Sequence, residues 1–451
     1  MIAPLRNLTY RRLFAAQVVS LVGTGLATVA LGLLAYKLAG ADAGLVLGTA
    51  LAIKMIAYIG VAPVTGAFAS VLPRRAFLVA LDLVRAAIVL LLPFVDQIWQ
   101  VYVLIFVLQS ASAAFTPTFQ ATIPDILPDE REYTEALSLS RLAYDLESLL
   151  SSMLAALLLT VISFHWLFAG TAIGFIVSAL LVVSVSLPRA AGQDGEQGGI
   201  YDRTTRGLRI YLATPRLRGL LALNLAAAAA GAMVIVNTVV IVRTVLGGTD
   251  TGVAVALGLF GAGSMISALA LPRLLDRLAD RTVMVTAAGG LASILLGLGA
   301  AALFATPGWT LLLTAWLVIG LCYSAVLTPG GRLLRRSSHE SDRPALFAAQ
   351  FALSHACWLV TYPLAGWLGA GAGLASAFLA LALLAAAGLA TAVIVWPNYD
   401  PEVVAHVHQD LPHDHPHLAG ANVVASGHRH AHRLVIDRHH KHWPSSQSET
   451  A

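Results

Sequence analysis

The chain has 451 residues, of which 58% are hydrophobic and 12% are charged, and its mean hydropathy is +0.78. A soluble globular chain carries about 25% charged residues, so this composition excludes a soluble fold and makes the bilayer the solvent. The net charge of +4 comes from Lys and Arg residues spread over many short loops, which excludes a nucleic-acid-binding face.

Apolar segments long enough to cross a bilayer recur along the whole chain. A transmembrane helix needs about 20 apolar residues to span about 30 Å of hydrocarbon. Such segments lie near 13–36, 44–70, 76–95, 98–120, 139–163, 165–187, 217–243, 251–272, 282–304, 309–328, 345–368 and 371–396. The first is longer than a signal-peptide core of about 7 to 15 residues, so we expect it to be retained.

These segments predict an all-α integral membrane protein with about twelve transmembrane helices in two six-helix halves. We assign 1–190 to the first half, 191–216 to a cytoplasmic loop, 217–396 to the second half, and 397–451 to a cytoplasmic tail.

The distribution of positive charge predicts the orientation. Twenty Lys or Arg residues lie in the N-terminus and in the loops after spans two, four, six, eight and ten, or at their edges, whereas the other side holds only Lys37 and Arg243. Cytoplasmic loops carry an excess of Lys and Arg. We therefore expect a multi-pass protein of the bacterial cytoplasmic (inner) membrane with both termini in the cytoplasm.

Two six-span halves joined by a charged loop resemble the major facilitator superfamily, whose halves are related by a pseudo-twofold axis along the membrane normal. Its short loop signature is present in part, in Gly66, Arg74, Arg75, Asp276, Arg277, Asp280 and Arg281. The pair Asp82 and Arg85, and the segment 115–125, resemble the enterobactin-exporter and multidrug branch of the superfamily. This resemblance implies secondary transport, with efflux favoured over uptake.

Two further segments narrow the resemblance. Residues 141–152 in span five and 351–362 in span eleven, taken with the histidine-rich tail, resemble the NreB-type nickel-resistance exporters. That resemblance implies export of Ni(II) from the cytoplasm.

Eleven of the 14 histidines lie in the tail, in four clusters: His406 and His408; His413, His415 and His417; His428, His430 and His432; His439, His440 and His442. In an extended segment, residues two apart project from one side, so neighbouring imidazoles can converge on one ion. With an unperturbed pKa near 6.5, most imidazoles are neutral ligands at cytosolic pH.

Nitrogen ligands suit Ni, Zn, Cu and Co, and Asp410, Asp414 and Asp437 could add oxygen atoms. We therefore predict a disordered tail that binds more than one divalent ion, Ni(II) with Co(II) or Zn(II) as further candidates. The alternative is a polar disordered tail of drifted composition, or a segment that binds the membrane surface in a pH-dependent way.

Few ionisable residues lie inside the predicted spans: Lys54, Asp82, Arg85, Asp145, Glu147 and His355. A charge at a helix centre costs about 2.5 to 3.5 kcal/mol on insertion scales, so such residues usually have partners or a role. We predict structural pairing for Asp82 with Arg85, three residues apart, and pairing of Asp145 with Arg141, one turn away.

Glu147, His355 and Lys54 lie near the predicted midplane, where transporter sites are found. We predict that they line the transport path with Asp145 and Tyr362. The alternative is that Lys54 neutralises Glu147 permanently and that His355 bonds Tyr362 or a carbonyl.

Two functions stay open. The first is a secondary exporter of a divalent metal ion driven by proton antiport, because a metal ligand must lose its proton before it binds the ion. The second is a proton-driven exporter of drugs or siderophores whose tail only buffers metal. No catalytic set is visible, so we expect no enzyme, no resident cofactor and no nucleic-acid partner, but a functional monomer that meets metal ions, protons and lipid.

Overall fold

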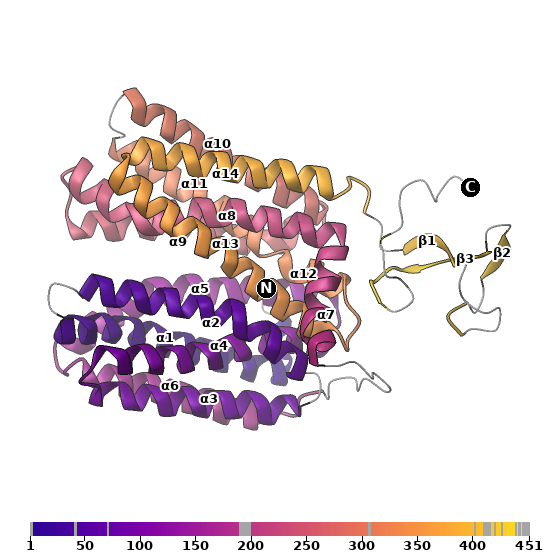
Figure 1. The fold of residues 1–451 in the computed structure, drawn as a ribbon, viewed down its shortest axis with the longest axis horizontal. Helices are drawn as coiled ribbons and strands as arrows, with labels where there is room; N and C mark the ends of the chain where they lie inside the picture. Colours follow the sequence, from indigo (N-terminus) through magenta and orange to yellow (C-terminus); the bar gives the residue numbers. More distant parts are fainter. Residues whose placement is uncertain are drawn as a thin grey trace.

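The computed structural model describes residues 3–39, 43–69, 72–188, 200–304, 308–400 and, within the tail, 403–408, 416–418, 421–424, 427–437, 440 and 443. The chain folds into two bundles of long helices, with three short strands beyond one end of them (Figure 1). The tail strands lie at the end that also carries α7 and α12.

The first bundle contains six long helices: α1 (Leu8–Ala39), α2 (Ala43–Ala69), α3 (Arg74–Leu91), α4 (Ile98–Ile126), α5 (Glu130–Leu159) and α6 (His165–Val183). The second contains α8 (Pro215–Val240), α9 (Asp250–Leu275), α10 (Asp280–Phe304), α11 (Trp309–Leu327), α13 (Arg343–Gly371) and α14 (Leu374–Val395). Two shorter helices, α7 (Ile200–Ala213) and α12 (Gly330–Arg336), lie at one end. Each of the predicted spans falls on one long helix, so the predicted fold class is confirmed.

Eleven of these helices, searched over the described residues, are long and apolar enough to cross a membrane. The remaining long helix is α5, which has Arg141, Asp145 and Glu147 along its span. Large apolar side chains such as Phe94, Phe304 and Ile394 are exposed on the outside of the bundles. Lipid is the environment in which such a surface is stable.

Small residues let the helices pack closely. A Cβ atom added to Gly263 of α9 would lie 2.0 Å from the carbonyl oxygen of Leu317, and one added to Gly320 of α11 would lie 2.0 Å from the carbonyl oxygen of Phe260. The α9 and α11 backbones therefore touch, as at other membrane interfaces rich in small residues.

The two bundles meet along several helix pairs. Helix α13 packs against α2 and α4, and α9 packs against α5. The residues of α2, α5 and α13 that we predicted to line a transport path are thus carried by helices of the contact between the bundles.

Ion pairs join the bundles at the end that carries α7 and α12, which we call the basic end. Asp125 of α4 pairs with Arg74 and also with Arg343 of α13. Arg332 of α12 lies 2.6 Å from Glu130 at the start of α5. These contacts between the two bundles hold the basic end closed.

The described part of the tail forms a small antiparallel sheet in the order β1-β3-β2. Its strands are β1 (Val403–His408), β2 (Asn422–Val424) and β3 (Gly427–Arg433), and a short helix, η5 (Pro416–Leu418), precedes β2. The prediction of a disordered tail did not foresee these strands.

Candidate functional site

Strand pairing gathers tail histidines on one face of the sheet. His406 of β1 pairs in register with His430 of β3, and His408 pairs with His428. Because side chains alternate between the two faces, His432 lies on the same face, two residues beyond His430. The predicted spacing of two residues therefore gathers histidines from two paired strands and not from a single extended segment.

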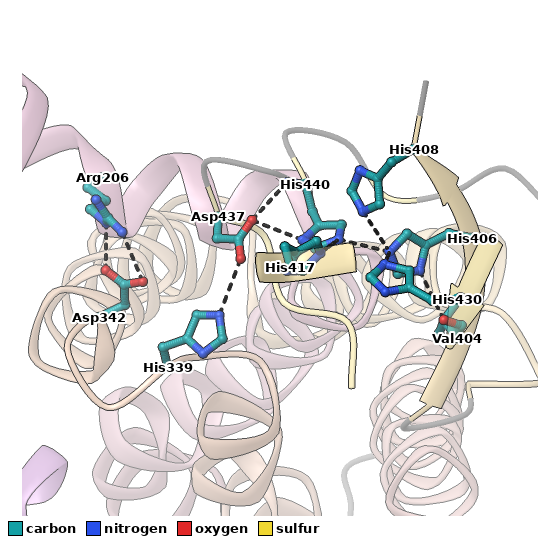
Figure 2. A network of polar contacts seen from close by, with 10 residues as sticks. All are labelled: Arg206, His339, Asp342, Val404, His406, His408, His417, His430, Asp437 and His440. Carbon is teal, nitrogen blue, oxygen red and sulfur yellow. Dashed lines mark hydrogen bonds and ion pairs between the residues drawn. The ribbon is translucent and has the colours of Figure 1, made fainter. Parts of the chain in front are cut away.

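Five histidines form one cluster, which we call the histidine centre: His406, His417, His430, His432 and His440. Each offers one ring nitrogen, and these five atoms lie within 4.8 Å of one another. The histidines come from β1, η5, β3 and the segment after β3, so chain positions 34 residues apart meet here (Figure 2).

His406 brings several ring nitrogens to distances at which they could share one cation. Its Nε2 lies 3.1 Å from Nε2 of His430, 2.9 Å from Nε2 of His440 and 3.2 Å from Nε2 of His408. A neutral imidazole nitrogen has either one hydrogen or one lone pair, so it cannot satisfy three neighbouring nitrogens by hydrogen bonding. Lone pairs that converge on one metal ion would account for this arrangement.

The protonation states suit metal binding. Burial, together with the neighbouring imidazoles, lowers the pKa of His406 and of His408 to about 4. Burial also lowers the pKa of His430. These rings are neutral at pH 7 and keep a lone pair, and an all-imidazole donor set fits Ni, Co, Zn or Cu(II) better than the oxygen-seeking Mg and Ca.

Asp437 lies behind the histidine centre. Its Oδ1 accepts hydrogen bonds from Nδ1 of His440 at 2.9 Å and from the backbone N–H of His440 at 2.8 Å. Burial opposes ionisation of this carboxyl, but hydrogen bonds from His339 and His440 outweigh burial and hold its pKa well below the usual range. Carboxylates in this position orient a metal-binding imidazole, so Asp437 supports a ligand here instead of adding a ligand oxygen.

Other predicted tail ligands have different positions. His408 lies beside the centre but outside the group of five. His428 of β3 is the register partner of His408. The remaining predicted ligands, His413, His415, His439 and His442, and the acidic residues Asp410 and Asp414, lie outside the described residues.

The membrane part places His355 in an aromatic environment. Its ring centroid lies 4.7 Å from that of Tyr58 on α2 and 4.2 Å from that of Phe351. Nδ1 of His355 donates a hydrogen bond to the carbonyl oxygen of Phe351 at 2.7 Å, as the alternative prediction of a carbonyl partner required. In the neutral ring Nε2 then holds the lone pair, so the same bond fixes the tautomer that can bind a metal ion or a proton.

Lys54 and Glu147 are not directly paired in the part of the chain that the structure describes. The Lys54 ammonium lies 5.5 Å from the centroid of the Tyr58 ring. The Glu147 carboxylate faces α1, where a Cβ atom added to Gly25 would lie 2.7 Å from Glu147 Oε1. The charge of Lys54 nevertheless acts on the Glu147 carboxyl without an ion pair, so both predictions for these two residues stay predictions.

Asp145 belongs to a polar bridge between the bundles. Its carboxylate lies 2.7 Å from Arg141, so the predicted ion pair is confirmed. Arg141 also donates to the Ser264 hydroxyl of α9 at 3.0 Å, and its guanidinium lies 4.8 Å from the Tyr323 ring centroid. Sequence reasoning missed Ser264 and Tyr323, because neither is charged and both come from the other bundle.

Tyr362 lies on an aromatic face of α13. Its ring centroid is 4.8 Å from that of Trp358, which in turn lies 6.3 Å from that of Tyr323. Among the described residues, a group of three or more potential metal ligands occurs in the tail, where it is the histidine centre. The described parts of the spans hold no such group.

Residues 13–301 and 221–429 match the profile of the Major Facilitator Superfamily. The chain belongs to the major facilitator superfamily. It is 23% identical to macrolide efflux protein A of Streptococcus pyogenes over 188 residues. These residues make up 41% of this chain and 46% of the relative. It is 25% identical to the uncharacterized MFS-type transporter YfiS of Bacillus subtilis over 282 residues. These residues make up 59% of this chain and 64% of the relative. The chain thus spans about half the length of the first relative and less than two thirds of the second.

Solved structures share the fold. The human organic anion transporter MFSD10 (TETRAN) superimposes with a TM-score of 0.74 at 13% identity, over 86% of this chain and 99% of the other. A bacterial homologue of the iron transporter ferroportin in the outward-facing state superimposes with a TM-score of 0.68 at 14% identity, over 85% of this chain and 97% of the other. The chain is thus a multi-pass membrane protein of this superfamily, and the solved structures share its fold.

Within this superfamily fold, the two predicted loop-motif pairs differ. Asp82 of α3 pairs with Arg85 and accepts a hydrogen bond from Ser178 at 2.8 Å, and the carboxylate is fully buried. Asp276 lies 3.8 Å from Arg131 and is partly exposed. The predicted pairing of Asp82 with Arg85 is therefore confirmed, whereas the role predicted for both loop-motif pairs stays a prediction.

We expect His355→Ala to lower transport and to change its pH dependence, because the substitution removes the Nε2 lone pair next to the contact between the bundles. Transport by reconstituted protein, measured from pH 5.5 to 8 and normalised to protein abundance, tests this. Phe351→Leu is the matched control, because it alters the same aromatic cluster and keeps both the imidazole and the carbonyl. If His355→Ala behaves as wild type does in rate and in pH profile, His355 is a packing residue.

Proposed function

We propose that this chain is a secondary active efflux transporter that exports a divalent transition-metal ion, Ni(II) in first place, from the cytoplasm by proton antiport. One observation supports the proposal most: five imidazole nitrogens within 4.8 Å of one another, at the end of the bundles where the predicted cytoplasmic loops lie. The resemblance of 141–152 and 351–362 to NreB-type exporters points to the same substrate.

The histidine centre would act as a capture site at the mouth of the transporter. Metal ions bound there are concentrated next to the basic end, and the membrane helices must supply the alternating-access path. Binding at His355 or Glu147 competes with protons, because both groups must be deprotonated to bind a cation. Proton movement in the opposite direction follows from that competition.

A second candidate, export of an organic compound, is favoured by aromatic side chains at and beside the contact between the bundles. Tyr58, Phe351, Tyr323, Trp358 and Tyr362 offer flat apolar faces, which suit an organic molecule as well as they suit a hydrated ion. The name of the Streptococcus pyogenes relative indicates macrolide efflux for that protein. In this case the histidine centre would only buffer metal.

Growth of a metal-sensitive bacterium separates the two candidates. Expression of the full chain should raise the inhibitory concentration of Ni(II), and a chain ending at residue 396 should keep part of this protection at equal membrane level. The truncation should reduce tolerance because capture is lost while the path remains. Protection against macrolides or dyes, with none against Ni, Co, Zn or Cu, would favour the organic substrate.

A further inference from the structure

The histidine centre is linked to the body of the transporter by a continuous chain of polar contacts (Figure 2). His440 directs Nε2 to the centre and donates Nδ1–H to Oδ1 of Asp437. The second carboxylate oxygen, Oδ2, accepts from Nε2 of His339 at 3.4 Å. His339 lies in the connection between α12 and α13, outside the tail. One carboxylate therefore contacts a proposed metal ligand and the transporter body at the same time.

His339 occupies a structurally important position at the start of α13. Its carbonyl oxygen accepts the backbone N–H groups of Asp342 at 3.1 Å and Arg343 at 3.2 Å. Asp342 also accepts a hydrogen bond from Arg206 of α7 at 3.2 Å, and Arg343 pairs with Asp125 of the first bundle. The connection that Asp437 touches thus leads directly into the ion pairs that hold the basic end closed.

The base of the tail is anchored independently of this link. Asp400 lies 3.3 Å from Arg216 of α8, and Arg281 donates to the carbonyl oxygen of Trp396 at 2.9 Å. Between the tail sheet and the connection is a cavity of about 520 Å³ lined by His339, His417, His430, His432 and Asp437, among others. The segment around Asp437 also touches the second bundle, because Ile436 packs in its core and the Arg216 guanidinium lies 4.9 Å from the Trp443 ring centroid.

We propose that Asp437 is a positioning residue that docks the histidine centre on His339, so that metal binding in the centre and docking on the α12–α13 connection strengthen each other. This inference rests on the metal binding by the tail stated under the proposed function. A metal ion on Nε2 of His440 withdraws electron density from the ring and strengthens the Nδ1–H bond to Asp437. That bond fixes the carboxylate, whose second oxygen then meets His339.

Thermodynamic linkage relates the metal affinity to the docking equilibrium. If metal binding favours docking by a given factor, docking must favour metal binding by the same factor. Loss of the docking partner His339 should thus weaken metal binding, although His339 is not one of the five clustered ligands. A residue with a purely structural role in the connection would not have this effect.

The test uses the full-length protein in lipid nanodiscs, with Ni(II) as the probe. Calorimetry gives the Ni(II) affinity, and hydrogen exchange gives the protection of residues 337–343 with and without Ni(II). The variants are Asp437→Asn and His339→Gln. Glu340→Gln is the matched control, because it also changes one side chain of the same connection and lies next to His339 in the sequence.

We expect Ni(II) to slow exchange of 337–343 in the wild type and in Glu340→Gln. Asp437→Asn should lower the Ni(II) affinity about 10-fold or more, as is usual for a residue behind a ligand. His339→Gln should lower it about fivefold or more, and Ni(II) should no longer protect 337–343. The same protection of the α13 interior in all variants would show that the fold is retained.

Wild-type Ni(II) affinity in His339→Gln, with unchanged protection of 337–343, would overturn the coupling. A wild-type chain that binds no Ni(II) would overturn the coupling and the capture site together. If the chain binds Ni(II), shows the coupling and transports none, the proposed substrate is wrong while the docking stands.

Discussion

Replacing His406 and His430 together with alanine should lower the Ni(II) affinity of the full-length protein by about 100-fold or more. The two side chains face each other in the β1–β3 register and supply two of the five converging nitrogens. Substitution of a residue that supports a metal ligand typically lowers the metal affinity about 10- to 100-fold. Loss of two ligands should lower it by more than that. Calorimetry at pH 7 measures the effect.

The matched control is the double substitution of Val407 and Arg429 with alanine. These two residues also face each other in the β1–β3 register, next to the His406–His430 pair, but their side chains alternate to the other face of the sheet. They should change the affinity much less. Equal losses in the two double variants would mean that the sheet itself, and not ligation by the centre, is what the substitutions disturb.

Asp82→Ala should destabilise the protein by about 3 to 5 kcal/mol and deplete it from the membrane, because it leaves a buried charge without its partner. The Arg85 side chain is 5% exposed, and its guanidinium lies 4.1 Å from the Phe115 ring centroid and 4.4 Å from that of Phe175. Neither ring can replace a carboxylate. The thermal midpoint of the purified protein and its membrane abundance measure the loss.

Asp276→Ala is the control for this second prediction. The Asp276 side chain is 41% exposed, its partner Arg131 is 67% exposed, and water screens the pair. Exposed ion pairs contribute about 0 to 1 kcal/mol, so the thermal midpoint should change little. A loss as large as that of Asp82→Ala would show that Asp276 supports the basic end in a way that the contact with Arg131 does not explain.

The membrane fold could be predicted from the sequence because the bilayer imposes one strong rule, about 20 apolar residues for each crossing. The predicted spans therefore match the long helices. Pairs of charges three or four residues apart could be predicted for the same local reason, as Asp82 with Arg85 and Asp145 with Arg141 show.

The histidine centre could be predicted only in part. The spacing of two places His430 and His432 on one face, but it gives no information on which distant segments join them. His417 and His440 reach the centre through the path of the chain after each strand, which no local pattern encodes. His339 was missed because a single histidine in a charged loop resembles any solvated residue, and only the folded tail brings Asp437 to it.

Flux of Ni(II) across a membrane that contains only this protein tests the central claim most directly. Purified chain is reconstituted into liposomes, a pH gradient is imposed, and a metal-sensitive dye inside the liposomes reports Ni(II), with a macrolide and a cationic dye assayed in parallel. The proposal predicts Ni(II) accumulation on the acidic side that a protonophore abolishes. Transport of the macrolide or the dye, with no movement of Ni(II), would contradict it.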